Sequence, residues 1–100
     1  MSDPALQLNL MKLLSTKHFP LKDPRRKVKL DLLGKAVGKV AGGQVPEMTA
    51  LFDNLCELKG RGHVNTIPKI ILKEEVDSVE FEIWLTPLGR TELERKLTNA

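Results

Sequence analysis

Basic side chains gather in one stretch of the first half of the chain, between residues 17 and 39. This stretch carries a net charge of +6, whereas residues 51–100 carry a net charge of −2. An anionic partner should therefore prefer the first half of the chain. The stretch either contacts nucleic acid or forms a solvated face with dispersed charge. Its basic residues are Lys17, Lys22, Arg25, Arg26, Lys27, Lys29, Lys35 and Lys39.

The other side chains that could do chemistry form no recognisable reactive or metal-binding set. His18 and His63 lack the Cys, His or carboxylate spacing typical of metal ligands. Cys56 falls beside the apolar face of a predicted helix, where we expect a buried structural thiol. We interpret Gly42-Gly43 as a helix terminator, because no strand and lysine signature of a phosphate-binding loop accompanies it. We therefore expect no metal, no cofactor and no enzymatic activity.

The size and composition of the chain indicate one domain. One hundred residues can bury a modest core, and 41% hydrophobic with 29% charged residues is typical of a globular protein. No run of about 18 apolar residues occurs, so we expect no contact with a membrane. The N-terminal residues lack the pattern of a secretory signal. A single cysteine cannot form an internal disulfide, so we expect a reducing, cytoplasmic setting.

The first predicted helix runs from Pro4 to about residue 15, with Asp3 as its cap. Leucines at helical spacing form one face, and Leu8 with Met11 falls on roughly the opposite side. The helix is either central to one small core or uses Leu8 and Met11 to contact a second subunit in a homodimer. The leucines of the first face are Leu6, Leu10, Leu13 and Leu14.

The second predicted helix spans residues 31–41 and follows a loop that contains Phe19, which we expect to tuck under the domain. A short strand over Val28 and Leu30 could precede the helix. Alternatively, the helix begins at Asp23-Pro24 and is longer. Gly34 and Gly38 predict a short helix packed closely against a neighbour. The expected inward residues are Leu33, Ala36, Val37 and Val40, and the outward ones are Asp31, Lys35 and Lys39, with an Asp31–Lys35 pair.

The third predicted helix spans residues 46–59, with Pro46 at its first position. It is strongly amphipathic. Its expected inward residues are Met48, Leu51, Phe52, Leu55 and Leu58, and its expected outward residues are Thr49, Ala50, Asp53, Asn54 and Glu57.

A β-hairpin is predicted over residues 64–85, because apolar residues alternate with polar ones along Val79–Leu85. A four-residue turn at Glu74–Asp77 pairs Thr66 with Leu85 and Pro68 with Ile83. The same register pairs Ile70 with Phe81 and Leu72 with Val79 on the inward face, and Lys69 with Glu82 on the outward face.

The outward face of this hairpin carries three large apolar side chains, Ile67, Ile71 and Trp84. Either the first helix or the N-terminal segment covers them, or they form a patch for a protein partner or a dimer. A last helix over residues 87–97 follows, with Thr86 as its N-cap and Pro87 at its first position.

This order of elements resembles the winged-helix family of helix-turn-helix domains over nearly the whole chain. Val28 to Gly38 is similar to the segment of strand and second helix. Met48 to Val64 is similar to a third helix leading into the first wing strand. Leu85-Thr86-x-x-Gly89-Arg90-x-Glu92-Leu93 resembles the end of the wing and the following helix in MarR and PadR regulators. The expected fold is α+β: a three-helix core, a small antiparallel hairpin and a C-terminal helix in one domain over residues 1–100.

The resemblance implies DNA binding and a role in transcription regulation. The third helix would lie in the major groove and the hairpin tip near the backbone. Arg61 could hold a phosphate or stay solvated. The residues expected to contact phosphates are Arg25, Arg26, Lys27, Lys29, Lys35 and Lys39, and those expected near bases are Gln44, Thr49 and Asn54.

The charge of the implied reading surfaces favours a second hypothesis. The third helix places Glu47, Asp53 and Glu57 on its outer side, and the hairpin tip holds three further carboxylates. Phosphates repel such surfaces. The alternative is therefore a winged-helix module that binds another protein without reading DNA.

Overall fold

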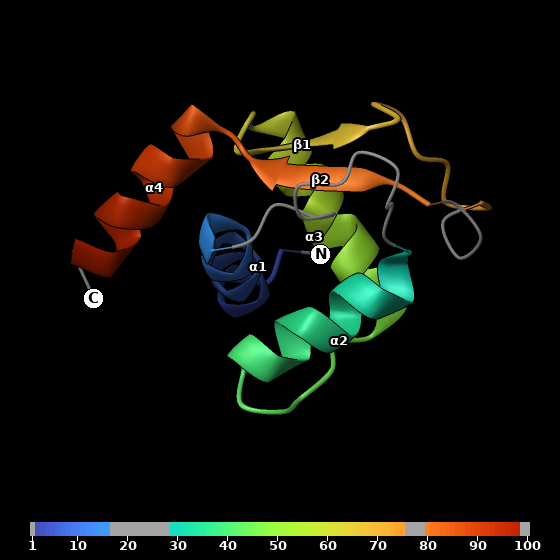
Figure 1. Ribbon diagram of the computed structural model, residues 1–100, viewed down its shortest axis with the longest axis horizontal. Coiled ribbons are helices and arrows are strands. Elements are labelled where there is room, and N and C mark those ends of the chain that lie inside the picture. Colours follow the sequence, from blue (N-terminus) through green and yellow to red (C-terminus); the bar gives the residue numbers. More distant parts are fainter. Residues whose placement is uncertain (1, 17–28, 76–79, 99–100) are drawn as a thin grey trace.

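The computed structural model describes residues 2–16, 29–75 and 80–98 of the chain. Within these residues the fold is α+β, with four helices and one antiparallel two-stranded sheet (Figure 1). The predictions for His18, Phe19, Val28 and Val79 lie outside the described residues. The elements are α1 Pro4–Thr16, α2 Leu30–Val40, α3 Met48–Gly60, β1 Val64–Ile67, β2 Glu82–Leu85 and α4 Pro87–Thr98.

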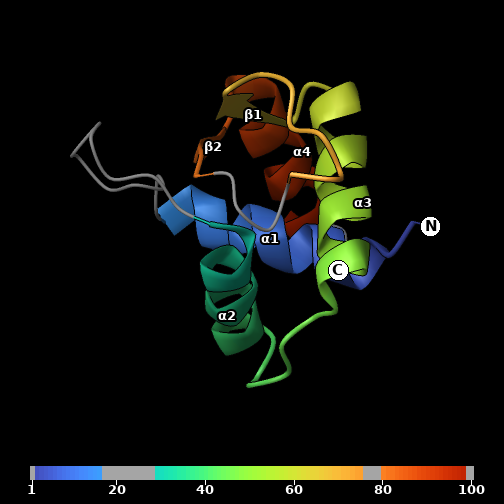
Figure 2. The same cartoon turned by 90° about the vertical axis from the view of Figure 1, so that its right-hand side faces the viewer.

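Helix α1 is the centre of the molecule. It contacts α2, α3, α4 and β2, and Figures 1 and 2 show it between α2 on one side and the hairpin on the other. Its leucine face is buried as predicted, and Met11 on the other side is fully buried too. A helix covered on several sides needs more than one apolar stripe, so the expectation of a central helix is confirmed.

The start of α1 follows the sequence prediction. The backbone N–H of Leu6 donates to Oδ1 of Asp3 at 3.1 Å, which satisfies one of the free donors of the first turn. Pro4 is the first helical residue. Asp3 and Pro4, neighbours in the sequence, therefore determine where this helix begins.

Helix α2 takes the shorter of its two predicted forms. Lys29 precedes it in an extended conformation, and Leu30 is its first residue rather than part of a strand. Leu33 and Val37 are buried, but Val40 is 39% exposed and does not point inward as predicted.

The two glycines of α2 allow a close approach to the segment that follows. A Cβ on Gly34 would lie 2.6 Å from Cε of Met48, and a Cβ on Gly38 would lie 3.1 Å from Cγ2 of Val45. The predicted tight packing of this helix is thus confirmed. Helix α3 begins two residues later than expected, at Met48, because Glu47 still has an extended backbone.

The hairpin register differs from the prediction by two residues. Thr66 lies opposite Ile83 rather than Leu85, and Ile67 rather than Lys69 lies opposite Glu82. A shift of two keeps each side chain on its face, so Thr66 and Ile83 are both buried. The connection between the strands is residues 68–81, not a four-residue turn.

Strand β1 ends directly before Pro68, whose nitrogen cannot donate to a ladder. The Ile67–Pro68 peptide bond is cis. Beyond it the alternation predicted for a strand no longer applies: Ile70 is 76% exposed and Ile71 is buried. The prediction that Ile70 and Leu72 face inward and Ile71 outward is therefore wrong.

Helix α4 is anchored at its start. The backbone N–H of Gly89 donates to Oγ1 of Thr86 at 3.0 Å, so the predicted N-cap is confirmed. The Thr86 hydroxyl in turn donates to the carbonyl oxygen of Gly62. This bond ties the helix to the turn before β1.

Candidate nucleic-acid interface

The basic face of α2 is the part of the predicted DNA contact that the structure describes. Lys29, Lys35 and Lys39 are exposed. Asp31 accepts a hydrogen bond from the N–H of Leu32 at 2.7 Å, and no Asp31–Lys35 ion pair forms. Within the described parts of the chain the three lysines have no carboxylate partner, so their charge is available to an anion.

Three more residues of the predicted contact, Arg25, Arg26 and Lys27, lie outside the described residues. Their charge is nonetheless a fact of the sequence. Residues 17–28 hold five basic residues and one acidic residue, whereas the described residues hold eleven of each. The excess positive charge of the protein therefore belongs to the segment that joins α1 to α2.

The predicted base-contacting residues separate into two groups. Gln44 and Thr49 are exposed, in the connection before α3 and in its first turn. Asn54 is fully buried, so the prediction that it faces outward toward bases is wrong. It lies three residues after Leu51 and four before Leu58, which places it on the apolar face of the helix.

A buried polar cluster joins the start of α1 to α3. Oδ1 of Asn54 accepts hydrogen bonds from the backbone N–H of Asp3 at 2.8 Å and from Nε2 of Gln7 at 2.9 Å. Nδ2 of Asn54 donates to the carbonyl oxygen of Ala50 at 2.8 Å. Buried amides need such partners, so Asn54 has a structural role.

The sequence reasoning missed Gln7, which is 1% exposed. A signal was present, because Gln7 lies three residues before Leu10 and seven before Leu14, on the leucine face of α1. A polar residue at such a position predicts a buried hydrogen-bond partner. The identity of that partner, on another helix, was not predictable from spacing.

Arg61 belongs to the same cluster. Its Nη1 donates to Oε1 of Gln7 at 2.9 Å, and its Nη2 lies 3.6 Å from Oε1 of Glu57. Oε2 of Glu57 also accepts from Nε2 of Gln7, at 2.6 Å. Arg61 is therefore not simply solvated, but its side chain is still 45% exposed, so a phosphate contact stays a prediction.

Leu8 and Met11, the predicted dimer surface, are not freely exposed on α1. Met11 is fully buried inside the chain, and Leu8 is half-buried against the core. A side chain already packed inside its own chain cannot also cover a second subunit. The hypothesis that Leu8 and Met11 form a subunit contact is wrong for Met11.

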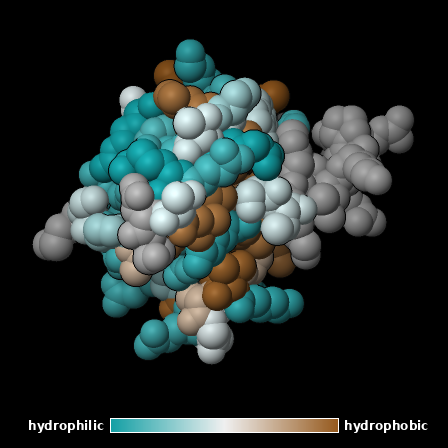
Figure 3. All heavy atoms as spheres, turned by 90° about the vertical axis from the view of Figure 1, so that its left-hand side faces the viewer, coloured by the Kyte–Doolittle hydropathy of each residue, from teal (hydrophilic) through white to brown (hydrophobic). Residues whose placement is uncertain are grey.

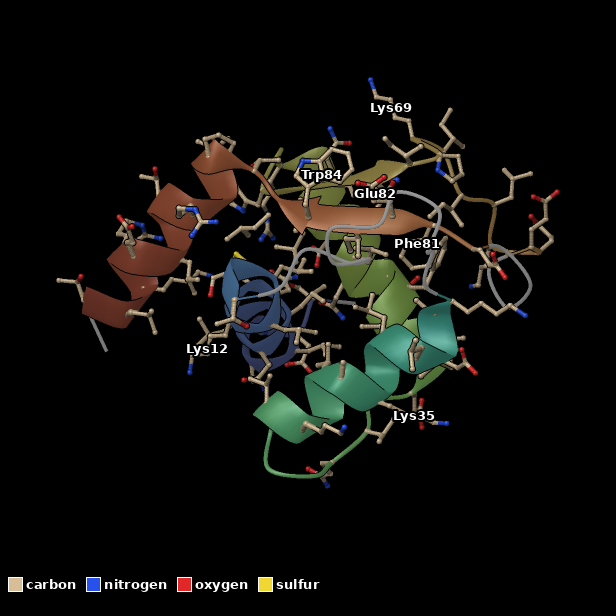
Figure 4. The ribbon with its side chains drawn as sticks, in the orientation of Figure 1. Lys12, Lys35, Lys69, Phe81, Glu82 and Trp84 are labelled. Carbon is tan, nitrogen blue, oxygen red and sulfur yellow. The ribbon has the colours of Figure 1, made fainter. Side chains whose placement is uncertain are left out.

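The apolar patch predicted on the hairpin is smaller than expected. Ile71 is buried, which removes it from the patch. Ile67 is half exposed, and Trp84 lies opposite Asn65. Figure 4 shows Trp84 and Glu82 on the side of β2 away from α1. Ile67 and Trp84 thus remain on the outer face.

Cys56 is exposed on α3, contrary to the prediction of a buried thiol. Partial burial of its sulfur raises the pKa of the thiol, and the nearby Lys59 ammonium partly opposes that rise. A raised pKa keeps the thiol protonated at neutral pH, which disfavours a role as nucleophile.

Lys59 is itself partly buried, and this burial lowers its pKa. Its Nζ donates to the carbonyl oxygen of Lys69, in the segment after β1. This cation at the end of α3 is therefore engaged with the hairpin.

His63 has a buried Nδ1 without a hydrogen-bond partner among the described residues. In that part of the chain no three His, Cys, Asp or Glu side chains gather as a metal site would require. No described helix has the length and apolar character needed to cross a membrane. Comparisons with protein-family models, with curated protein sequences and with solved structures found no match.

Proposed function

We propose that this protein is a small cytoplasmic winged-helix protein that binds double-stranded DNA and acts as a transcription regulator. The order of α1, α2, α3, the hairpin and α4 supports the fold proposal. The observation that carries the function is the distribution of charge. The positive excess of the chain lies in residues 17–28, immediately before the exposed lysines of α2.

Contacts to phosphates are the main source of affinity in this proposal. Lys29, directly before α2, and Lys35 and Lys39 within it continue the basic segment, and none of them pairs with a carboxylate of the described residues. Neutralising phosphates with lysine and arginine releases counterions, so binding should weaken steeply as salt rises.

Base reading by α3 contributes little. Glu47 is exposed, Asp53 is half-buried, and Asn54 is unavailable because it is buried. Thr49 and Gln44 are the remaining predicted base contacts. Each good bidentate base contact discriminates by about 1–3 kcal/mol, so two single polar side chains give low sequence selectivity.

Fluorescence anisotropy of a labelled random-sequence duplex at two salt concentrations tests the proposal. We expect tight binding at low salt that weakens steeply at high salt, with amide NMR shifts concentrated in residues 22–39. Replacing Lys35 and Lys39 together with glutamine should weaken binding by about tenfold or more, equivalent to at least 1.4 kcal/mol.

The matched control removes the same kind of charge from another helix. Arg90 is exposed on α4, so Arg90→Gln together with Lys96→Gln should change the affinity much less. The absence of binding at low salt would sink the proposal. An equal decrease in affinity for both pairs of variants would move the contact away from α2.

The outer face of the hairpin favours a second candidate function, the binding of a protein partner. Ile67 is half exposed and Trp84 lies on the same face, while α3 carries two half-buried carboxylates, Asp53 and Glu57. Trp84 is the single tryptophan of the chain, so its fluorescence reports on this face. Partner binding there should shift the emission to shorter wavelength. If a DNA duplex leaves the emission unchanged, DNA does not bind at the outer face of the hairpin.

A further inference from the structure

A groove of about 520 Å³ lies between the end of α1 and the outer side of α2. It is within the size range of binding sites for ligands and partner side chains, roughly 300–1,000 Å³. Helix α1 contributes its last turns, and α2 contributes residues from nearly its whole length. The groove is lined by Leu13, Thr16, Leu32, Lys35, Ala36, Lys39 and Val40.

The floor of the groove on α2 is an apolar stripe whose two ends are exposed. Leu32, Ala36 and Val40 recur at every fourth residue, so they form one line along the helix. Leu32 is 54% exposed and Val40 is 39% exposed. Ala36, between them, is half-buried and also packs against the core, which Leu33 and Val37 fill from the neighbouring face. Exposed apolar surface in a line, next to charged residues, is typical of an interaction site.

One edge of the groove is positively charged. Lys35 and Lys39 line it beside the apolar stripe, and neither has a carboxylate partner among the described residues. Lys12 projects from α1 away from the hairpin (Figure 4). Seen from the side on which α4 lies, apolar atoms run between polar side chains on the surface (Figure 3). A complementary ligand therefore combines an apolar stripe with carboxylates.

We infer that this groove binds an amphipathic helix of another protein, with apolar residues at every fourth position and Asp or Glu along one edge. A helix laid along α2 places one apolar residue per turn against Leu32, Ala36 and Val40, which together span roughly 12 Å of helix. Its carboxylates pair with Lys35 and Lys39. DNA offers the lysines its phosphates but offers the stripe no apolar partner. The inference does not depend on DNA binding.

A designed helical peptide tests the inference on the full-length protein. The peptide carries leucine at every fourth position and glutamate beside the leucine stripe. A matched peptide carries lysine in place of each glutamate. We expect the acidic peptide to shift the amide NMR signals of the end of α1 and of α2. The lysine peptide should bind at least tenfold more weakly, or not at all.

Two kinds of variant separate the apolar and the charged contributions. The apolar variant combines Leu32→Gln with Val40→Gln, and the charge variant combines Lys35→Glu with Lys39→Glu. Each should lower the affinity for the acidic peptide about tenfold or more. All four side chains are exposed, so the charge variant keeps the test valid if the apolar one fails to fold. Leu88→Gln on α4 is the matched control, because Leu88 is 56% exposed and lies outside the groove.

Three outcomes would overturn the inference. The first is no shift at millimolar acidic peptide. The second is equal binding of the acidic and lysine peptides. The third is a dimer, detected by sedimentation, that Leu32→Gln converts to a monomer, because the groove would then bind a second copy of this chain.

Discussion

Asn54 is the residue whose role changes most between sequence and structure. A polar amide in the middle of a helix was expected on the outer side, near DNA bases. Its Oδ1 instead accepts from the N–H of Asp3, directly before the first helix, and from Gln7 within it, and the side chain has no exposed surface. Asn54 therefore fastens α1 to α3.

The substitution Asn54→Leu tests this role. It keeps a similar volume but leaves the Asp3 N–H without its acceptor, so we expect a decrease of about 1–3 kcal/mol in the free energy of unfolding. Urea denaturation measures this decrease. Thr49→Ala, at an exposed position of the same helix, is the control and should change stability by less than about 0.5 kcal/mol. An unchanged stability in Asn54→Leu would contradict the buried cluster.

Cys56 gives a prediction about pH. Because its thiol is exposed, it should react with an alkylating reagent in the folded protein. Because partial burial raises its pKa, the midpoint of the rate against pH should lie above that of the urea-unfolded chain. Lys59→Gln removes the charge that lowers this pKa and should raise the midpoint further. A midpoint below that of the unfolded chain would refute the account.

At the scale of elements, α2 carries three different faces. One packs into the core through Leu33 and Val37, a second approaches the next segment through Gly34 and Gly38, and the rest is exposed. Apolar periodicity predicted the first face, and the two glycines predicted the close packing of the second. Val40, which the same periodicity assigns to the core, is the last residue of the helix and is 39% exposed.

The junction of β1 with α4 depends on the absence of a side chain at Gly89. A Cβ at this position would lie 2.0 Å from the carbonyl oxygen of His63, a backbone atom that cannot move independently. Gly89→Ala should therefore destabilise the protein by about 1–3 kcal/mol or more, measured by thermal or urea unfolding.

Gly60 is the matched control for that substitution. It is also helical, and a Cβ there meets no atom within 4 Å. Gly60→Ala should leave the stability unchanged or raise it by about 0.4–1 kcal/mol. If both substitutions changed the stability equally, the close contact at Gly89 would not explain the destabilisation of Gly89→Ala.

At the scale of the whole molecule, charge is the feature that distinguishes one region from another. The described residues contain equal numbers of basic and acidic side chains, and the excess lies between α1 and α2. This separation is readable from the sequence alone. Which partner this positive charge reaches depends on where the folded domain places the two ends of the segment between α1 and α2.

The salt dependence of DNA binding measures how much of the affinity comes from this segment. The triple variant combines Arg25→Gln, Arg26→Gln and Lys27→Gln. The plot of log K against log salt should become less steep, by about 0.9 for each phosphate that the variant no longer neutralises. Anisotropy titrations of wild type and variant give the two slopes. Circular dichroism checks that the variant is folded. Equal slopes would show that these three cations do not bind phosphates.

The sequence by itself determined the features that depend on near neighbours in the chain. Asp3 and Thr86 cap the helices that follow them, and the apolar periods identified most of the core. These features are predictable because a cap bonds to an N–H three residues away and a helical face repeats every three to four residues.

Only the tertiary structure decided the features that join distant segments. These are the hairpin register, the burial of Asn54, the engagement of Arg61 and the groove between α1 and α2. Local spacing cannot predict them, because each depends on which side chain of another element fills the space opposite. The same lysines of α2 were predicted from the sequence, but the apolar stripe beside them became visible only when α1 was placed against α2.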